Sequence, residues 1–486
     1  MKCRIAHAAP LVLLGGIGAC SLAPPYRTPA TAAPAPVYHE VGEWKQAAPA
    51  DSVARGPWWN LFQDPTLNAF EERVSASNEN IKAALARLEE ARAQTRIARA
   101  AYFPTITANS SATRARESVN APTYNPLHPG DFNDFQLEAQ VSYEFDVFGR
   151  VRNSVAAARA SQQASAADLA VLDLSTHAEL ASDYFTLRSD DAQAMLLDHT
   201  VADYARALQL TENLYNGGAA PLSDLEQARA QLETAKTQAA DIRLNRAQSE
   251  HAIAVLLGEQ ASSFHIDPTP LEANAVPPAI DPGLPSALLE RRPDVAGAER
   301  RVASANAQIG VARAAYFPVF SLAATAGFES TAISNWISAP SRLWSLGPAG
   351  VLTLFDGGLH HAQSAYAHAV YDEQVADYRG TVLSAYQEVE DNLAALRQLQ
   401  EESVSEAAAV AATKSALEQA QYRYQGGIVT YLEVVTEENA ALSAQLSAAD
   451  IQLRRLNASV VLVKALGGSW QNPLATPAAP LADRAP

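Results

Sequence analysis

Alternating hydrophobic and polar positions predict four strands in this chain. Every second residue of Asp134–Asp146 is apolar and the residues between are polar, a period of two that indicates a strand with one apolar and one wet face. Thr105–Arg116 is predicted to be its weaker partner strand. Phe320–Phe328 alternates in the same way, and its return strand is expected at Gly347–Phe355.

Long stretches without glycine or proline predict unusually long helices. Arg150–Asn216 runs for 67 residues without either, and Leu359–Gln425 has the same length with only Gly380. At 1.5 Å per residue such a helix would be about 100 Å long, which favours a coiled coil or a helical array. Each is followed by a Gly-Gly pair and a second helical stretch, Leu222–Leu257 or Thr430–Leu466. The chain is therefore predicted to contain two long helical hairpins.

An internal duplication relates the two halves of the chain. Ser77–Pro104 aligned with Arg291–Pro318 gives 12 identities in 28 positions, and both segments end in ARAAYFP. The Gly-Gly pairs that follow the two long helices lie 209 residues apart. Thr66–Phe103 lacks glycine and proline and is rich in strong helix formers, so one helix is predicted there. Self-similarity of this kind indicates two copies of one structural unit.

Charge and the first residues add a location to this picture. A net charge of −17 leaves no basic stripe for a nucleic-acid partner. After a positive start, the apolar run Ala8–Ala19 is shorter than the ~20 residues of a membrane-spanning helix, so residues 1–19 are predicted to be a signal peptide. Ile17–Cys20 resembles a lipobox, which predicts diacylglycerol and N-acyl chains on Cys20. An ordinary secretory signal that happens to contain a cysteine is the alternative. Ser21, in place of aspartate, points to the outer membrane.

Four amphipathic strands are too few to enclose a pore. No later segment reaches the ~18 uninterrupted apolar residues of a membrane helix, so any span must use strands. Small membrane barrels have about eight strands, and an open sheet would expose unpaired edges to lipid. We therefore expect strands from several subunits to close a barrel, with Glu138, Glu144 and Asp146 lining its lumen. A soluble periplasmic coiled-coil protein anchored by lipid is the alternative.

Several short motifs occur in a fixed order along the chain. They are the lipobox, a Trp-Trp pair at Trp58, both ARAAYFP heptapeptides, Phe145–Arg150, Arg291–Asp294 and Ala465–Trp470. Together they resemble the TolC-like outer-membrane factors, and more closely the lipidated NodT-type branch that serves resistance–nodulation–division efflux systems. The resemblance extends from about Cys20 to Trp470.

The resemblance implies an α+β fold, mostly α. It implies an internally duplicated protomer of a homotrimer, whose outer-membrane β-barrel takes four strands from each chain, twelve in total, and continues into a long periplasmic α-helical barrel. The expected domains are a lipid-anchored extended segment (20–65), a first repeat (66–258), an equatorial connector (259–290), a second repeat (291–470) and a disordered tail (471–486).

The implied function is that of an exit duct in a tripartite efflux system. The duct would export small molecules such as drugs, passively, and would be gated at its periplasmic tip. The implied partners are a periplasmic adaptor, an inner-membrane resistance–nodulation–division pump and outer-membrane lipid; without a phosphate-binding loop, this subunit is not the motor. A duct for type I protein secretion or heavy-metal efflux is an alternative, and a lipid-anchored coiled-coil scaffold or adhesin is another.

The family closes its channel at the helical turns, and some of its gate positions match this chain. Asp224 and Glu433 fall on gate carboxylates and Tyr424 on the gate tyrosine; Glu226 is a further candidate. Val429 stands at the position of the family's gate arginine, so the locking network differs.

The same acids also have a simpler interpretation. Ser223 with Glu226, and Thr430 with Glu433, fit the spacing of a capping box, in which the glutamate serves only the helix N-terminus. Asp224 would suit the positive end of a helix dipole. The two roles can coexist.

The Gly-Gly turns are candidate docking points for the adaptor. Gly217 with Gly218, and Gly426 with Gly427, permit a tight turn that a partner could engage. The alternative is that they only supply the positive φ that a helix C-terminus favours.

Catalysis is not expected from this sequence. It contains no nucleophile elbow, zinc-protease motif or Cys-x-x-Cys motif. His360 and His361 are adjacent at a helix start and point to different sides, so no metal site is expected. No cofactor is predicted apart from the lipid on Cys20.

Overall fold

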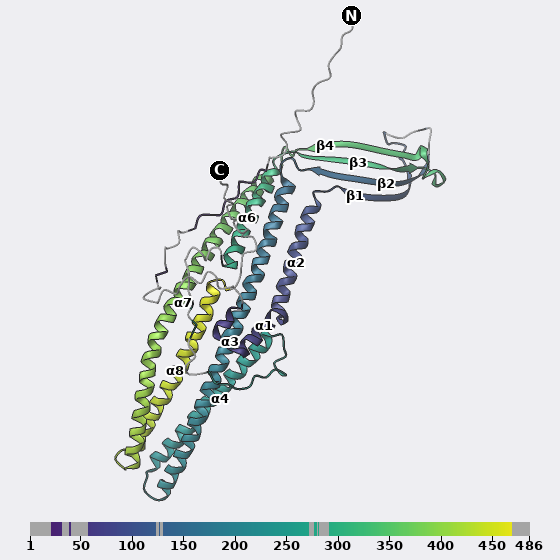
Figure 1. Cartoon of the computed structure of the whole chain (residues 1–486). Coiled ribbons are helices and arrows are strands. Elements are labelled where there is room, and N and C mark those ends of the chain that lie inside the picture. Colours follow the sequence, from purple (N-terminus) through teal and green to yellow (C-terminus); the bar gives the residue numbers. More distant parts are fainter. Residues whose placement is uncertain are drawn as a thin grey trace, which may run out of the picture. The chain divides into compact units, whose positions relative to one another are not determined.

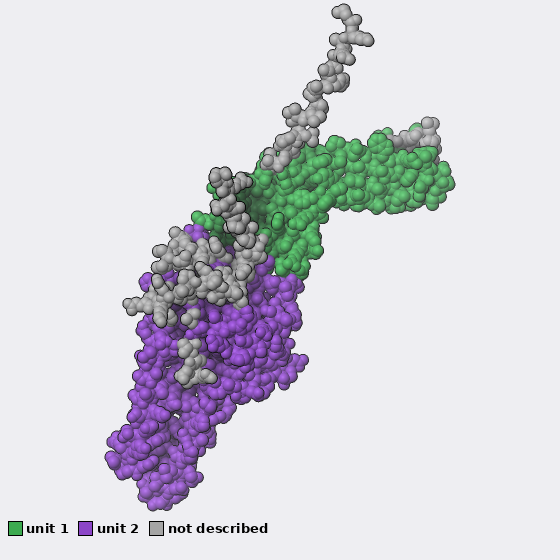
Figure 2. Space-filling view, viewed as in Figure 1, with its two compact units in different colours: residues 1–30, 88–165, 298–378 green, residues 31–87, 166–297, 379–486 purple. Residues whose placement is uncertain are grey.

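The computed structural model forms two compact units (Figure 2). The first comprises residues 1–30, 88–165 and 298–378, and the second comprises residues 31–87, 166–297 and 379–486. Each unit contains parts of both sequence repeats. The structure describes residues 21–31, 38–39, 57–122, 126, 130–271, 277–278, 280 and 291–468. The predicted signal peptide, Cys20 and the tail 471–486 lie outside these residues.

The first unit contains one antiparallel four-stranded sheet in the order β1-β2-β3-β4 (Figure 1). Its strands are β1 (Thr105–Arg116), β2 (Asp131–Phe145), β3 (Val319–Ser330) and β4 (Arg342–Val351). The central pairing of β2 with β3 joins the two sequence copies, with Leu137 opposite Phe328. The predicted positions of β1, β2 and β3 are confirmed.

The predicted position of β4, Gly347–Phe355, is wrong by several residues. Pairing with β3 sets the true bounds, because Phe328 lies opposite Arg342 and Val319 lies opposite Val351. Gly347, Pro348 and Gly350 interrupt the alternation within the strand, and such residues weaken a strand signal. The connection before β4 carries two short 3-10 helices, η4 (Ile333–Asn335) and η5 (Ala339–Ser341).

None of the four strands contains a residue that is buried by the part of the chain that the structure describes. Every residue of β1, an edge strand, is exposed. Trp344 of β4, the other edge strand, is 79% exposed, and Leu346 is 63% exposed. Apolar side chains on a sheet normally pack against a second layer. The exposed apolar side chains of these strands therefore form a surface that a partner could cover.

The residues that follow Cys20 pack on helices of the first unit. Ser21 Oγ donates a hydrogen bond to Asn153 Oδ1 at 3.0 Å, and Asn306 Nδ2 donates to the Pro24 carbonyl at 2.9 Å. A Cβ at Gly310 would lie 2.6 Å from Ala23. Only glycine allows this close approach of the N-terminal segment.

The two predicted helical hairpins are confirmed. Helices α3 (Arg150–Asn216) and α7 (Leu359–Gln425) each have 67 residues, and the return helices α4 (Leu222–Leu256) and α8 (Tyr431–Ala465) each have 35. Equivalent helices begin 209 residues apart, as the duplication predicts. No helix among the described residues is long and apolar enough to cross a membrane.

The single helix predicted at Thr66–Phe103 is in fact two helices. They are α1 (Pro65–Ser77) and α2 (Glu79–Ala100); α2 corresponds to α6 (Pro293–Ala314) in the second repeat. The break occurs at Asn78, whose side-chain oxygen accepts from the Asn80 and Ile81 N–H groups. Its amide also donates to the Leu256 carbonyl at 2.9 Å. Because Asn78 caps α2 while it binds α4, the chain turns there instead of continuing as one helix.

The main core of the second unit lies where α1, α3, α4 and α8 meet. The 3-10 helix η2 (Trp58–Phe62) contributes Trp58, which packs with Leu180, Ile253 and Val460. Tyr184 OH donates to Asp64 at 2.7 Å, and the same carboxylate caps the first turn of α1. The core therefore fixes the middle of α3. The hairpin ends lie outside this core and depend on separate contacts.

Candidate functional site

The two hairpin turns are built alike. At the end of α3 the Ala219 N–H binds the Leu214 carbonyl, and at the end of α7 the Ile428 N–H binds the Arg423 carbonyl. This is the Schellman motif, in which the residue before the last donor takes a positive φ. Gly218 (φ 75°) and Gly427 (φ 69°) occupy that position. The C-cap role of these two glycines is confirmed, and adaptor docking at the four turn glycines stays a prediction.

Neither predicted capping box forms. Helix α4 begins after Pro221, so Ser223 lies inside the helix, and Thr430 at the start of α8 makes no side-chain cap bond. In α4 the N-cap is Pro221, which has no side-chain acceptor, and in α8 the N-cap is Thr430, whose hydroxyl accepts no cap hydrogen bond. Glu226 instead pairs with Arg229 within α4, N to O 3.1 Å.

An ion pair closes the second hairpin at its tip. Arg423 Nη1 in the last turn of α7 lies 2.5 Å from Glu433 Oε1 in the first turn of α8. The side chains are 50% and 38% exposed, so this ion pair contributes only a modest amount to stability. Sequence reasoning found Glu433 but missed Arg423, whose signal was a basic residue in the last helical turn.

Tyr424 packs on Tyr431 and faces the first hairpin. Their ring centroids lie 5.5 Å apart. Burial raises the pKa of Tyr424, a hydrogen bond with Thr211 of α3 opposes the shift, and the Asp224 carboxylate adds to it. The Asp224 carboxylate of the first hairpin is therefore near enough to Tyr424 of the second hairpin to raise its pKa.

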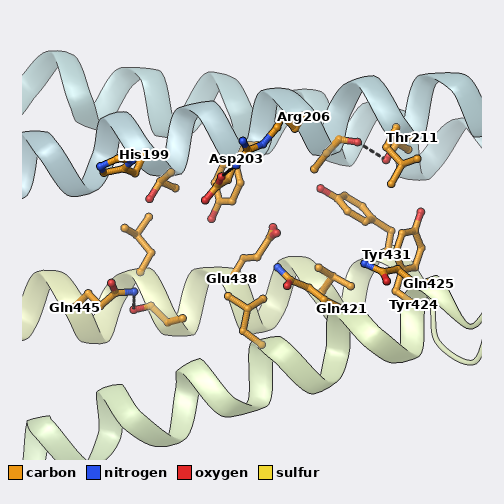
Figure 3. A pocket seen from close by; sticks show the side chains of 18 of the residues that line it. His199, Asp203, Arg206, Thr211, Gln421, Tyr424, Gln425, Tyr431, Glu438 and Gln445 are labelled. Atoms are coloured by element: carbon orange, nitrogen blue, oxygen red, sulfur yellow. Dashed lines mark hydrogen bonds and ion pairs between the residues drawn. The ribbon is translucent and has the colours of Figure 1, made fainter.

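A cavity of about 630 Å³ lies next to this contact, between α3 on one side and α7 and α8 on the other (Figure 3). Glu438 of α8 and Asp203 of α3 project into it from opposite sides. Glu438 is 9% exposed, and its Oε2 has no hydrogen-bond donor among the described residues. Burial, and then the charge of Asp203, raises the pKa of Glu438 to about 7.

The three predicted lumen acids have different local roles. Glu144 accepts from Arg150 Nε at 2.9 Å, and Glu138 accepts from Gln140 at 3.2 Å. Asp146 lies just after β2, where it accepts from the Arg152 N–H at 2.8 Å and so caps α3. Sequence reasoning missed this capping role, and the assignment of the three acids to a lumen stays a prediction.

Residues 72–259 and 284–468 match the outer membrane efflux protein family. The chain belongs to this family. It is 32% identical over 462 residues to the toluene efflux pump outer membrane protein TtgC of Pseudomonas putida and to the antibiotic efflux pump outer membrane protein ArpC of the same species; each alignment covers 93% of both chains. Its structure resembles the outer-membrane channel OprN with a TM-score of 0.83 and 30% identity, over 92% of this chain and 99% of that one.

This outer membrane efflux protein therefore combines a small sheet with long helical hairpins, as the sequence predicted. Tyr424 was the only predicted site residue that lines the cavity. Glu438 and Asp203 were missed because each lies in an unremarkable helical stretch. Only the packing of α3 against α8 shows that the two acids belong together.

Proposed function

We propose that three copies of this chain assemble into a continuous exit duct across the outer membrane and the periplasm. The observation that carries the proposal is the sheet, whose edge strands β1 and β4 have no strand partner on their outer sides among the described residues. In lipid each unpaired backbone group is costly. Pairing of β1 with β4 of the next copy would satisfy both edges at once and close a barrel.

We propose small organic molecules as the cargo. The two relatives are named for toluene and antibiotic efflux, and the alignments cover 93% of the chain. The duct itself would be passive, with no catalysis. A periplasmic adaptor and an inner-membrane pump of the resistance–nodulation–division class would recruit the cargo and supply the energy.

We propose that the hairpin tips form the gate. Arg423 and Glu433 hold the second tip closed on itself, and Tyr424 packs this tip toward Thr211 of the first hairpin. Loosening the tip would free the second hairpin from the first. In a trimer the pair occurs three times, so about 0.5 kcal/mol for each copy would change the open–closed ratio by roughly tenfold.

Single-channel recording in planar bilayers tests the duct and its gate together. The wild-type protein is expected to conduct with rare openings, and Arg423→Ala or Glu433→Gln should raise the open probability by roughly tenfold. Lys236→Ala is the matched control, because it removes an ion pair with Glu233 that stays within α4 and involves no candidate gate residue. No conductance in any variant would contradict the duct, and equal open probability in all of them would contradict the gate.

We propose that Cys20 carries the lipid anchor. Ser21 and Pro24, just beyond it, are bound to Asn153 and Asn306, so an acylated Cys20 would be tied closely to the helices of the first unit. The intact mass of the purified protein should exceed that of residues 20–486 by a diacylglycerol and one acyl chain. An unmodified mass, or the same mass increment in Cys20→Ala, would contradict the anchor.

A further inference from the structure

We propose that the cavity between the two hairpins binds an organic cation, a quaternary ammonium or protonated amine on a compact apolar body. The site is the space that Glu438 and Asp203 enter from opposite sides (Figure 3). Its occupant would contact both hairpins of one chain.

The first argument is an acid without a partner. Glu438 is nine-tenths buried, yet no donor among the described residues reaches its Oε2. Asp203, the other acid of the cavity, already pairs with Arg206. A buried carboxylate is stable only when it is neutral or when a cation faces it. A ligand that brings a positive charge to Glu438 would supply the counter-charge that the described side chains do not.

The second argument is the lining around that acid. Tyr204 and Tyr431 are 4% and 2% exposed, and Tyr424 closes the end nearest the turn. Of the three rings, Tyr424 is the more exposed one and can offer a π face to an ammonium group, and Leu196, Leu442 and Val434 add apolar surface. A volume of about 630 Å³ lies within the range of small-molecule sites.

Other ligand classes fit less well. Anions would meet two carboxylates, with the Arg206 guanidinium already paired to Asp203. A divalent metal ion needs about six oxygen ligands at short range, whereas one carboxylate is free and the cavity is far larger than an ion. The remaining lining amides and hydroxyls are neutral, and His199 lies at the far end (Figure 3).

Occupancy would tie the two hairpins together. The cavity residues come from α3 on one side and from α7 and α8 on the other. A molecule held between Glu438 and the tyrosines would add contacts to both sides, and therefore stabilise the arrangement in which Tyr424 faces Thr211. The ligand would then act as a regulator of the hairpins and not as cargo.

The test uses benzyltrimethylammonium as the probe and the purified full-length protein in detergent. Its charge is permanent, so any pH dependence of binding reports on the protein, where Glu438, Asp203, His199, Arg206 and the cavity tyrosines are the groups that face the probe. Titration calorimetry at pH 8 should show saturable binding, at least about tenfold tighter than at pH 5.5, where Glu438 would be mostly protonated. Benzyl alcohol, a neutral probe, should bind much more weakly.

Two variants decide the outcome. Glu438→Gln keeps the size of the side chain and should weaken binding at pH 8 by at least about tenfold, while Glu437→Gln, next to it but outside the cavity, should bind as the wild type does. Equal binding by wild type and Glu438→Gln, or no saturable binding by wild-type protein, would overturn the site. Conductance of the same samples without probe reports on the duct independently.

Discussion

At the residue scale, Glu438 is the clearest case of a side chain whose chemistry depends on the fold. In the sequence it stands in an ordinary amphipathic helix beside Glu437. In the structure it is buried opposite Asp203, and its pKa rises to about 7. The burial follows from the packing of α8 against α3, which no local pattern encodes.

The raised pKa predicts how stability depends on pH. Between pH 4.5 and about 7 the folded state holds a proton on Glu438 that the unfolded state has lost, so the stabilising contribution of the neutral acid is present at low pH and disappears as pH rises through 7. Glu438→Gln should therefore leave stability unchanged at pH 4 and raise it at pH 8, by about 3 kcal/mol at most. Hydrogen exchange of α8 amides at the two pH values measures this.

Glu437→Gln serves as the control for that comparison, because this acid does not line the cavity. It should change the exchange of α8 equally little at both pH values. A Glu438→Gln protein that is less stable than wild type at pH 8 would contradict the assignment of a buried, unpaired carboxylate.

At the element scale, some bounds were predictable because their signals are local. Arg150–Asn216 was predicted to the residue, since glycine ends the helix and nothing interrupts it. The break at Asn78 was not, because the carbonyl that fixes it, on Leu256, lies 178 residues away. β4 was misplaced because its register comes from β3 and not from its own sequence. Likewise, Tyr424 and Asp224 were found through family resemblance, whereas Arg423 pairs only once the turn is formed.

The turn glycines make a prediction at the same scale. Gly218 requires a left-handed backbone and Gly217 does not, so Gly218→Ala should destabilise the first hairpin by about 1 kcal/mol. Gly217→Ala should fold normally, since its new Cβ would meet only the Asn213 and Leu214 carbonyls, at 3.4 and 3.6 Å. Thermal unfolding of the two variants measures both effects, and a pull-down with the adaptor then measures docking.

If docking needs a turn without side chains, Gly217→Ala should lose adaptor binding while its unfolding temperature is unchanged. Full adaptor binding by Gly217→Ala would show that the glycines serve only to end the helix. A destabilised Gly217→Ala together with a stable Gly218→Ala would contradict the turn geometry itself.

At the scale of the whole molecule, assembly predicts a specific neighbour for each sheet edge. Ala108 lies mid-strand in β1, and Ser345 and Leu346 lie mid-strand in β4. Ala108→Cys combined with either Ser345→Cys or Leu346→Cys should form disulfide-linked trimers on oxidation, because paired strands bring Cα atoms within about 6 Å. Denaturing gels without reductant measure the product.

Ala139→Cys with Leu346→Cys is the matched control for this cross-link. Ala139 belongs to β2, which already has β1 and β3 as neighbours, so no strand of another copy can reach it in the sheet. Cross-linking in the control, or none with either β1–β4 combination, would contradict closure through the edges.

The unpaired edge strands also affect the fate of the newly made chain before it assembles. Until its copies meet, each polypeptide carries two open templates for strand addition, together with unshielded tryptophan and leucine side chains. Such surfaces recruit any extended peptide nearby. The interval between synthesis and assembly is therefore the one in which strand addition by the wrong peptide competes with pairing between copies.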